Sequence, residues 1–377
     1  MLQLDFANRD ENIWEKILKI SFSYVFLIVL LAVIGTITLY SAANGAWNPW
    51  ALKHILRFGL AFVLMIGMAL IDFRRYYRVA YLFYFVTLLL LVAVEVFGHI
   101  GMGAQRWINF GVFKLQPSEL MKIGLVLFMA RYFSEVTLHG IRSVRGIIIP
   151  TVGALLPVAL IVLEPDLGTA LMLLITAGVM LLAVGVQLWK FVLVAVMGGA
   201  ALPIIWSFLH EYQQNRVLTF LNPERDPLGT GYHIIQSKIA FGSGGLWGKG
   251  FLHGTQTHLN FLPEKHTDFI FTMFSEEFGL VGSLSLLLVN ILVLSIGYLF
   301  AFRARNYFAK LVIIGLNTNY FLYVFINTAM VMGLLPVVGV PLPLISFGGS
   351  VMFSIMASFG IILCMSNSSV RKSSFDD

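Results

Sequence analysis

The sequence predicts an all-α, polytopic integral membrane protein with about ten transmembrane helices and a large extracytoplasmic loop. Hydrophobic residues make up 58% of the 377-residue chain and charged residues only 12%, which is more apolar than a soluble domain can cover with polar surface. Apolar stretches of about 20 residues recur along nearly the whole chain, and each is long enough to cross a hydrocarbon core. Such continuous stretches favour a helical bundle over a barrel of short alternating strands.

The expected helices follow directly from these stretches and form a single membrane domain over residues 1–377. In chain order we place them at 20–42, 52–71, 79–98, 117–133, 146–163, 167–186, 189–208, 269–300, 308–333 and 347–366. Basic residues gather at both termini and in the connections on one side, which by the positive-inside rule makes both termini cytoplasmic. These residues are Lys16, Lys19, Arg74, Arg75, Arg78, Arg142, Arg145, Lys190, Arg303, Arg305, Lys310, Arg371 and Lys372.

Cysteine content, charge and the first residues exclude several classes of protein. Cys364 is the single cysteine, so a disulfide framework or a cysteine metal site is excluded. The net charge is +6, but the basic residues are scattered at helix ends, so we expect no nucleic acid and instead anionic lipid headgroups or phosphates. The acidic start of the chain lacks the features of a secretory signal, and we expect it to be retained.

The segment 209–268 is the large extracytoplasmic loop. It is too long for a simple connector, and loops of this size are usually lids, binding elements or disordered linkers. Apolar residues within it, such as Ile234 and Phe241, argue against disorder. Residues 234–240 are therefore expected to form a short helix at the membrane interface.

This loop ends in a dense group of ionisable side chains, directly before an apolar helix that opens at Phe269. Ionisable groups beside a membrane span are costly and tend to be functional. Thr267 or Asp268 could simply cap the helix, yet Glu264, Lys265 and His266 are more ionisable neighbours than a cap needs. Asp268 is therefore our candidate catalytic residue. Glu276 and Glu277 lie about two turns farther into the same helix, and Glu276 at least requires a buried partner. The sequence does not identify their arginine or lysine partner.

A second group lies at the start of the helix expected at 117–133. Glu119 and Lys122 are three residues apart and share one helix face. They form either a neutralised structural pair or part of a functional site, since paired charges in a span usually face the bundle interior. Arg106 and Trp107 precede them on the same outer side, where Trp107 alone is typical of an interface anchor.

Three turns complete the candidates. In the segment 164–169, Asp166 is expected to cap the helix that follows it, with a cation role weakly indicated. The glycine-rich segment 242–250 lacks P-loop spacing, so it is either a mobile loop that brings Lys249 to a phosphate or a plain hinge. The proline- and glycine-rich segment 333–350 is expected to line or support the central site, because irregular backbone at membrane depth must be covered.

Together these motifs resemble the signature of the shape, elongation, division and sporulation family. The resemblance runs from about Ile20 to Cys364 in the family's order, and it is most similar to the rod-shape-determining branch, with the cell-division branch as the near alternative. The motifs that carry it are GAQRWINFG, QPSELMK, EPDLGTA, GYHIIQSKIAFGSGGLWGKG, LPEKHTDFIF and NTAMVMGLLPVVGVPLPLISFGGS.

The resemblance implies a ten-helix peptidoglycan glycosyltransferase of the bacterial cytoplasmic membrane. It would polymerise lipid II into glycan strands for cell elongation, with a class B penicillin-binding protein transpeptidase and other elongation-complex membrane proteins as partners. The family's catalytic aspartate corresponds to Asp268, its glutamate and lysine to Glu119 and Lys122, and its arginine–tryptophan pair to Arg106 and Trp107. We find no departure at these positions.

This chemistry needs a base for the acceptor hydroxyl and cations for the leaving pyrophosphate. We expect Asp268 to act as general base, or else to hold an assisting divalent cation, Mg²⁺ or Mn²⁺. Lys122 and Arg106 would face the pyrophosphate, and Glu119 would orient Lys122. Lys249, Lys265, His266 and Trp107 complete the expected substrate-binding residues.

Two other functions were weighed against this one. A transporter of the lipid-linked precursor fits ten helices with internal charges equally well, but the charged motifs gather on the outer face and the halves show no repeat. A scaffold that only docks other proteins does not account for the acid and lysine motifs.

Overall fold

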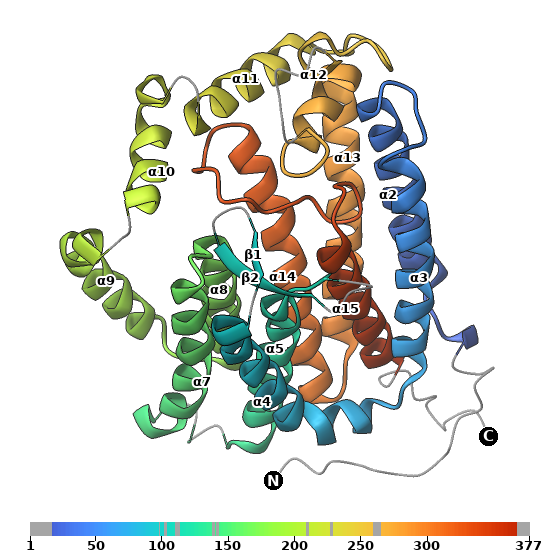
Figure 1. The fold of residues 1–377 in the computed structure, drawn as a ribbon. Helices are drawn as coiled ribbons and strands as arrows, with labels where there is room; N and C mark the ends of the chain where they lie inside the picture. The colour runs from blue at the N-terminus through green and yellow to red at the C-terminus, as the bar shows by residue number, and fades with distance from the viewer. Residues whose placement is uncertain are drawn as a thin grey trace.

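The structure, a computed structural model, describes residues 17–97, 99–101, 104–109, 114–137, 140, 143–208, 211–226, 229–258 and 265–367. Long helices occupy all ten predicted positions, which confirms the helical membrane fold (Figure 1). They are α2 (Phe22–Ala42), α3 (Ala51–Leu70), α4 (Phe73–Phe97), α5 (Pro117–Glu135), α7 (Val144–Leu163), α8 (Leu167–Val184), α9 (Leu188–Phe208), α13 (Ile270–Arg303), α14 (Tyr307–Val331) and α15 (Gly349–Asn367).

Eight helices within the described ranges are long and apolar enough to cross a membrane. The other two are α5, which carries Glu119, Lys122, Arg131 and Glu135, and α9, whose apolar stretch is shorter. The expectation of ten crossings therefore stays a prediction. Helices α14 and α15 form the centre of the bundle, since 78% of the apolar window of each is buried.

A small antiparallel sheet lies between α4 and α5, where the sequence suggested only a loop. Its strands are β1 (His99–Gly101), β2 (Ala104–Asn109) and β3 (Lys114–Leu115), in the order β1-β2-β3. Strand β2 reads Ala-Gln-Arg-Trp-Ile-Asn, in which apolar and polar residues do not alternate, so its pattern does not predict a strand. Arg106 and Trp107 both lie on this strand.

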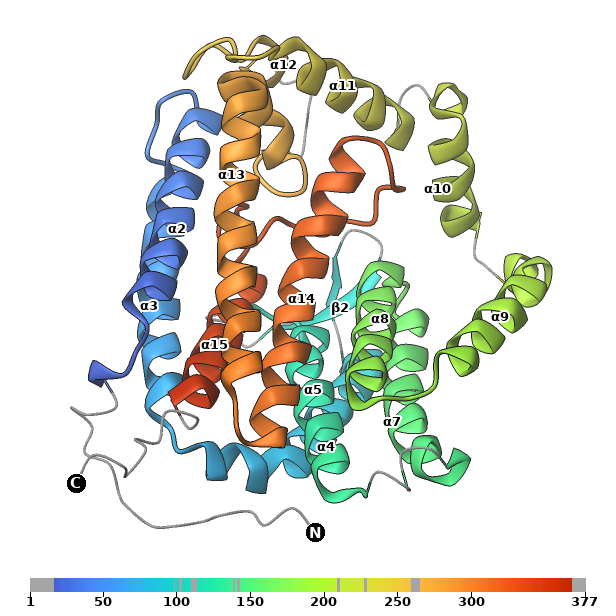
Figure 2. The same ribbon diagram turned by 180° about the vertical axis from the view of Figure 1, so that it is seen from behind.

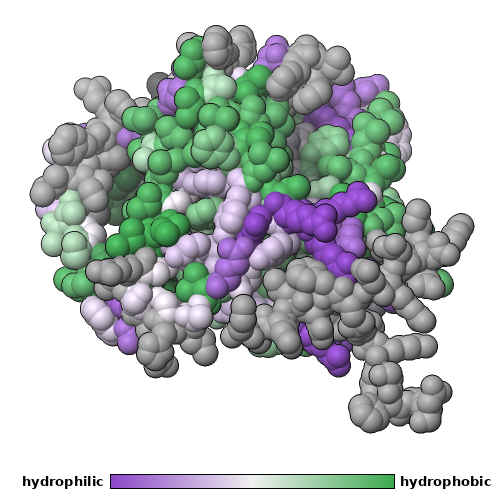
Figure 3. All heavy atoms as spheres, turned by 90° about the horizontal axis from the view of Figure 1, so that it is seen from below, coloured by the Kyte–Doolittle hydropathy of each residue, from purple (hydrophilic) through white to green (hydrophobic). Residues whose placement is uncertain are grey.

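The large loop is mostly helical. It contains α10 (Glu211–Leu221), the 3-10 helix η1 (Pro223–Arg225), α11 (Thr230–Ser243) and α12 (Thr255–His258). Helix α11 includes the residues 234–240 for which we expected a helix. Helices α11 and α12 lie at one end of the bundle, opposite the α3–α4 and α13–α14 connections (Figures 1 and 2). Hydrophilic side chains form a band across that opposite end (Figure 3).

Helix α13 is folded back on itself at Gly279, where the backbone leaves helical geometry at φ 65° and ψ −162°. Ser283 Oγ donates to Ser275 Oγ at 2.8 Å although the residues are eight apart, a separation that spans about 12 Å in a straight helix. We name residues 270–278 the short arm and 280–303 the long arm. The short arm lies beside the upper part of the long arm (Figure 2).

Candidate functional site

Glu119 and Lys122 form the centre of a buried polar cluster contributed by α5, α14 and α15. Lys122 Nζ lies 2.7 Å from Glu119 Oε1 and also contacts the Tyr323 hydroxyl. The Tyr323 hydroxyl lies 2.6 Å from both Glu119 oxygens, and Ser354 Oγ donates to Glu119 Oε2 at 2.7 Å. Glu119 and Lys122 are each only 4% exposed. The predicted Glu119–Lys122 pair therefore forms, and it lies buried inside the bundle with Tyr323 and Ser354 as further partners.

In this closed arrangement Lys122 is not free to make the predicted contact with a pyrophosphate. The Lys122 ammonium lies 4.2 Å from the centroid of the Tyr323 ring and is covered by its partners. Lys122 reaches a phosphate only if Tyr323 or Glu119 releases it.

Asp268 lies immediately before the short arm, and it does not occupy the capping position. The N-cap is Phe269, which makes no side-chain cap hydrogen bond, so neither Thr267 nor Asp268 stands at the N-cap position of this helix. Asn327 Nδ2 donates to the Asp268 carbonyl at 2.9 Å and to the Val340 carbonyl at 2.7 Å. The Asp268 carboxylate faces Gly339, where an added Cβ would come within 3.5 Å of Oδ2. Gly339 also has φ +74°, a conformation that favours glycine.

Helix α14 connects this aspartate to the Glu119–Lys122 cluster. Tyr323, which binds Glu119, and Asn327, which holds the Asp268 backbone, are four residues apart. Residues at that spacing are neighbours on one helix face. Two motifs that are distant in sequence are thus held one helical turn apart.

The segment before α15 supports the residues next to Asp268. Phe347 N donates to the His266 carbonyl at 2.8 Å, and Ser346 Oγ donates to the Thr267 carbonyl at 2.7 Å. The Leu342 amide in turn donates to Ser346 Oγ at 2.8 Å. The proline- and glycine-rich segment therefore supports the turn that leads to Asp268.

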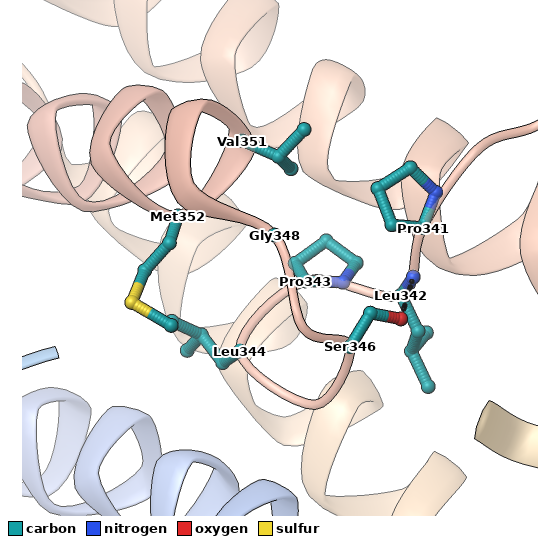
Figure 4. Close-up of a pocket in the computed structure, with 8 residues that line it drawn as sticks. All are labelled: Pro341, Leu342, Pro343, Leu344, Ser346, Gly348, Val351 and Met352. Atoms are coloured by element: carbon teal, nitrogen blue, oxygen red, sulfur yellow. Dashed lines mark hydrogen bonds between the residues drawn. The ribbon is translucent and has the colours of Figure 1, made fainter. Parts of the chain in front are cut away.

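The same segment encloses a small pocket of about 170 Å³ of empty volume. Figure 4 shows Ser346 within it, with its hydroxyl beside the Leu342 amide. The lining residues are Pro341, Leu342, Pro343, Leu344, Ser346, Gly348, Val351 and Met352. The pocket follows from the irregular backbone and is too small for a sugar of a lipid-linked substrate with its attached groups.

The first turns of α3 hold the other side of His266. The Trp50 and His266 rings stack with centroids 4.4 Å apart and an angle of 10°, and the Arg57 guanidinium lies 4.5 Å from the centroid of the Phe347 ring. Lys265 is buried, at 5% exposure, and this burial lowers the pKa of its ammonium.

For the glycan synthesis that the family resemblance implies, we expect Trp50→Ala to lower the rate about tenfold, because loss of about 1.4 kcal/mol of stacking that positions His266 corresponds to that factor. Trp50→Phe should restore most of the rate, since it keeps an aromatic face against His266. Initial rates of purified variants with labelled lipid II test this, with Trp189→Ala on exposed α9 as the control. Equal rates for Trp50→Ala and the unchanged protein would contradict it.

Arg106 binds the turn between α7 and α8. Its Nε donates to the Glu164 carbonyl at 3.1 Å and its Nη2 donates to the Pro165 carbonyl. Asp166 caps α8 as predicted, accepting from the Thr169 amide at 3.3 Å. The guanidinium therefore stabilises the α7–α8 turn in this arrangement.

The Glu164 carboxylate is buried in that turn, and neither of its oxygens has a hydrogen-bond partner. Burial, with the neighbouring charges of Asp166 and Glu95, raises its pKa from 4.5 to about 8, and Arg106 opposes the rise. The folded chain then keeps a proton that the unfolded chain has lost, so stability falls between pH 4.5 and about 8.

Glu164→Gln should remove this loss of stability. We expect the unfolding temperature of the natural chain to decrease as the pH is raised through this window, and that of Glu164→Gln to decrease less. Thermal unfolding in detergent at several pH values measures both. Parallel curves for the two proteins would show that Glu164 is ionised in the folded chain.

Lys249, whose side chain is 26% exposed, is the basic partner of Glu276 that the sequence could not identify. Lys249 Nζ lies 2.7 Å from Glu276 Oε1, and the Glu276 side chain is fully buried. The predicted approach of Lys249 to a phosphate therefore competes with an ion pair.

Several residues of this site escaped the sequence prediction, namely Trp50, Arg57, Tyr323, Asn327 and Ser354. A signal for two of them was present, because α14 contains an unusual number of polar side chains for an apolar helix, including Asn317, Asn319, Tyr320, Tyr323 and Asn327. Polar groups inside a membrane span usually face the bundle and mark a site.

Comparison with known proteins identifies the family. The family model for cell cycle proteins of the FtsW, RodA and SpoVE type matches residues 16–371. This chain belongs to the FtsW/RodA/SpoVE family. Its relative MrdB of Escherichia coli strain K12, a peptidoglycan glycosyltransferase, is 43% identical over 355 residues, which cover 94% of this chain and 95% of MrdB.

Solved structures of the FtsW/RodA/SpoVE family share the fold. A chain of a peptidoglycan synthase complex that coordinates polymerization and crosslinking is 29% identical, with a TM-score of 0.80, covering 94% of this chain and 99% of that one. The rod shape determining protein RodA of Thermus thermophilus is 26% identical, with a TM-score of 0.71, covering 94% and 98%. The predicted family and the resemblance to RodA are thus confirmed.

Proposed function

We propose that this chain is a peptidoglycan glycosyltransferase that polymerises lipid II into glycan strands during cell elongation and contributes to rod shape. The observation that carries this is the match to MrdB over nearly the full length of both chains. The geometry agrees with it, because Asp268 and the Glu119–Lys122 cluster are held on one face of α14.

The reaction joins two sugars and releases undecaprenyl pyrophosphate. The acceptor hydroxyl attacks the anomeric carbon as the bond from that carbon to the pyrophosphate oxygen breaks. We assign Asp268 as the base that takes the hydroxyl proton. Lys122, once Tyr323 or Glu119 releases it, and Arg106, once it leaves the α7–α8 turn, neutralise the leaving pyrophosphate, and Glu119 orients Lys122. Trp107, Lys265 and His266 contribute to substrate binding.

The alternative role of Asp268 is to hold Mg²⁺ or Mn²⁺, which bind proteins through one or two carboxylates together with substrate phosphates. The described part of the chain contains no group of three or more histidine, cysteine or acidic side chains that could hold a metal ion. A cation would therefore depend on the substrate's own oxygens, and no step above requires one.

The cellular setting completes the proposal. The protein lies in the bacterial cytoplasmic membrane with both termini in the cytoplasm, which is supported by the basic connections at one end of the bundle. Its partner is a class B penicillin-binding protein that crosslinks the new strands, together with other membrane proteins of elongation. The similarity to a chain of a peptidoglycan synthase complex supports this partner.

Purified protein and labelled lipid II test the proposal directly. We expect glycan strands on gels, either from the protein alone or when its transpeptidase is added. Absence of strands in both conditions, with efficient lipid II translocation in vesicles, would instead identify a transporter.

A further inference from the structure

A glycine-rich loop, residues 244–256, packs against the reversal of α13, and we name it the glycine loop. The backbone of α13 departs from helical geometry at Gly279, so main-chain groups on either side need partners from elsewhere. The loop supplies them. The amides of Lys249 and Gly250 donate to the carbonyls of Glu276 and Glu277, each at 3.0 Å.

Amides of α13 also donate hydrogen bonds to carbonyls of the glycine loop. The Leu280 amide donates to the Gly245 carbonyl at 2.9 Å, and the Val281 amide donates to the Leu246 carbonyl at 3.1 Å. The glycine loop therefore joins the end of the short arm to the start of the long arm.

Close backbone contact explains why the loop is rich in glycine. A Cβ at Gly244 would lie 2.2 Å from the Ser275 carbonyl oxygen, and one at Gly248 would lie 2.0 Å from the Glu277 carbonyl oxygen. Both distances are far below contact, so side chains are excluded there. These glycines serve packing rather than a phosphate.

An ion pair between the partly exposed Lys249 and the buried Glu276 closes the contact. Glu276 Oε1 accepts from Lys249 Nζ at 2.7 Å, from the Gln256 amide at 2.9 Å and from Thr255 Oγ1 at 3.3 Å. Lys249 Nζ also donates to Thr255 Oγ1 at 2.7 Å. Lys249 and the Thr255–Gln256 end of the loop therefore bind the same buried carboxylate, that of Glu276.

The short arm connects this contact to Asp268. It spans nine residues, or about 13 Å of helix, from Ile270 to Phe278, with Asp268 just before one end and the glycine loop at the other. Midway, Thr272 Oγ1 and Ser237 Oγ of α11 are 2.8 Å apart, and Ser237 Oγ donates to the Val331 carbonyl at 2.9 Å.

We propose that Lys249 is a positioning residue, which with Glu276 clamps the glycine loop to the α13 reversal and so fixes the short arm and Asp268. This inference rests on the proposed function, because the position of Asp268 is measured through glycan synthesis. It replaces the expectation that Lys249 binds a phosphate.

The test compares Lys249→Met, Glu276→Gln and the double variant. Lys249→Met leaves the buried Glu276 charge without its cation, which loosens the clamp, whereas the double variant removes both charges. We expect Lys249→Met to lower kcat about 10- to 100-fold, as small displacements of reacting groups do, with KM for lipid II unchanged. The double variant should recover most of kcat. Lys53→Met, at an exposed position of α3, should match the natural chain.

Two results would overturn the inference. One is an increased KM for Lys249→Met that the double variant does not correct, since a lysine that binds pyrophosphate cannot be replaced by removing Glu276. The other is an unchanged kcat. If Lys249→Met does not accumulate, the double variant is compared with the natural chain. A kcat and KM close to those of the natural chain support the clamp, and an increased KM overturns it.

A second measurement is independent of activity. Limited digestion with chymotrypsin, which cuts after Trp247 and Phe251, should be faster for Lys249→Met than for the natural chain or the double variant. If the natural chain makes no glycan but Lys249→Met is still digested faster than the other two proteins, the proposed function is rejected and the clamp is supported. Equal digestion rates for all variants would reject the clamp.

Discussion

Asp268→Asn is expected to lower glycan synthesis about 100- to 10,000-fold, the usual contribution of a general base. The substitution keeps the size of the side chain beside Gly339, and the Asn327 hydrogen bond to the residue 268 carbonyl does not depend on the side chain. The variant should therefore remain folded and inserted. Rates from labelled lipid II, together with thermal unfolding in detergent, measure the two effects separately.

The matched control is Glu224→Gln, which makes the same change from carboxylate to amide at an exposed position of the large loop. It should leave the rate within about twofold, because surface substitutions away from a site usually have small effects. Normal glycan synthesis by Asp268→Asn would remove Asp268 from the catalytic role.

Lys122→Met is expected to destabilise the folded protein by about 3–5 kcal/mol, because it leaves the buried Glu119 carboxylate without its cation. The double variant Lys122→Met/Glu119→Gln should regain most of this stability, since Tyr323 and Ser354 can still hydrogen-bond to the amide. Synthesis should stay low in both variants if Lys122 neutralises pyrophosphate.

Unfolding temperatures and synthesis rates of the two variants separate these roles. Lys53→Met, at an exposed position of α3, is the control for loss of one lysine. Recovery of both stability and synthesis in the double variant would make the pair structural only. Unchanged stability in Lys122→Met would contradict the expected cost of removing this cation.

The sequence predicted the membrane fold well because long apolar runs determine helices almost regardless of context. It also predicted features set by local chemistry, such as the Asp166 cap, the helix at residues 234–240 and the Glu119–Lys122 pair. Each of these depends on residues a few positions apart.

Contacts between distant segments could not be predicted in this way. Tyr323 lies 204 residues from Glu119, and Glu276 could be matched to Lys249 only after the reversal at Gly279 was known. The family resemblance supplied the role of Asp268, but not the asparagine that holds its backbone or the tryptophan that stacks on His266. Periodicity contains no information on which helices meet.

Asn327 has a thermodynamic consequence through its two donated hydrogen bonds. One side-chain amide binds a carbonyl on each of two segments, at Asp268 and at Val340. Neither segment can separate from α14 without breaking a bond at this asparagine, so the two should open as one cooperative unit rather than fray separately. Amide hydrogen exchange at Phe347, whose N–H is bonded to His266, would then report the opening free energy of the turn that carries Asp268.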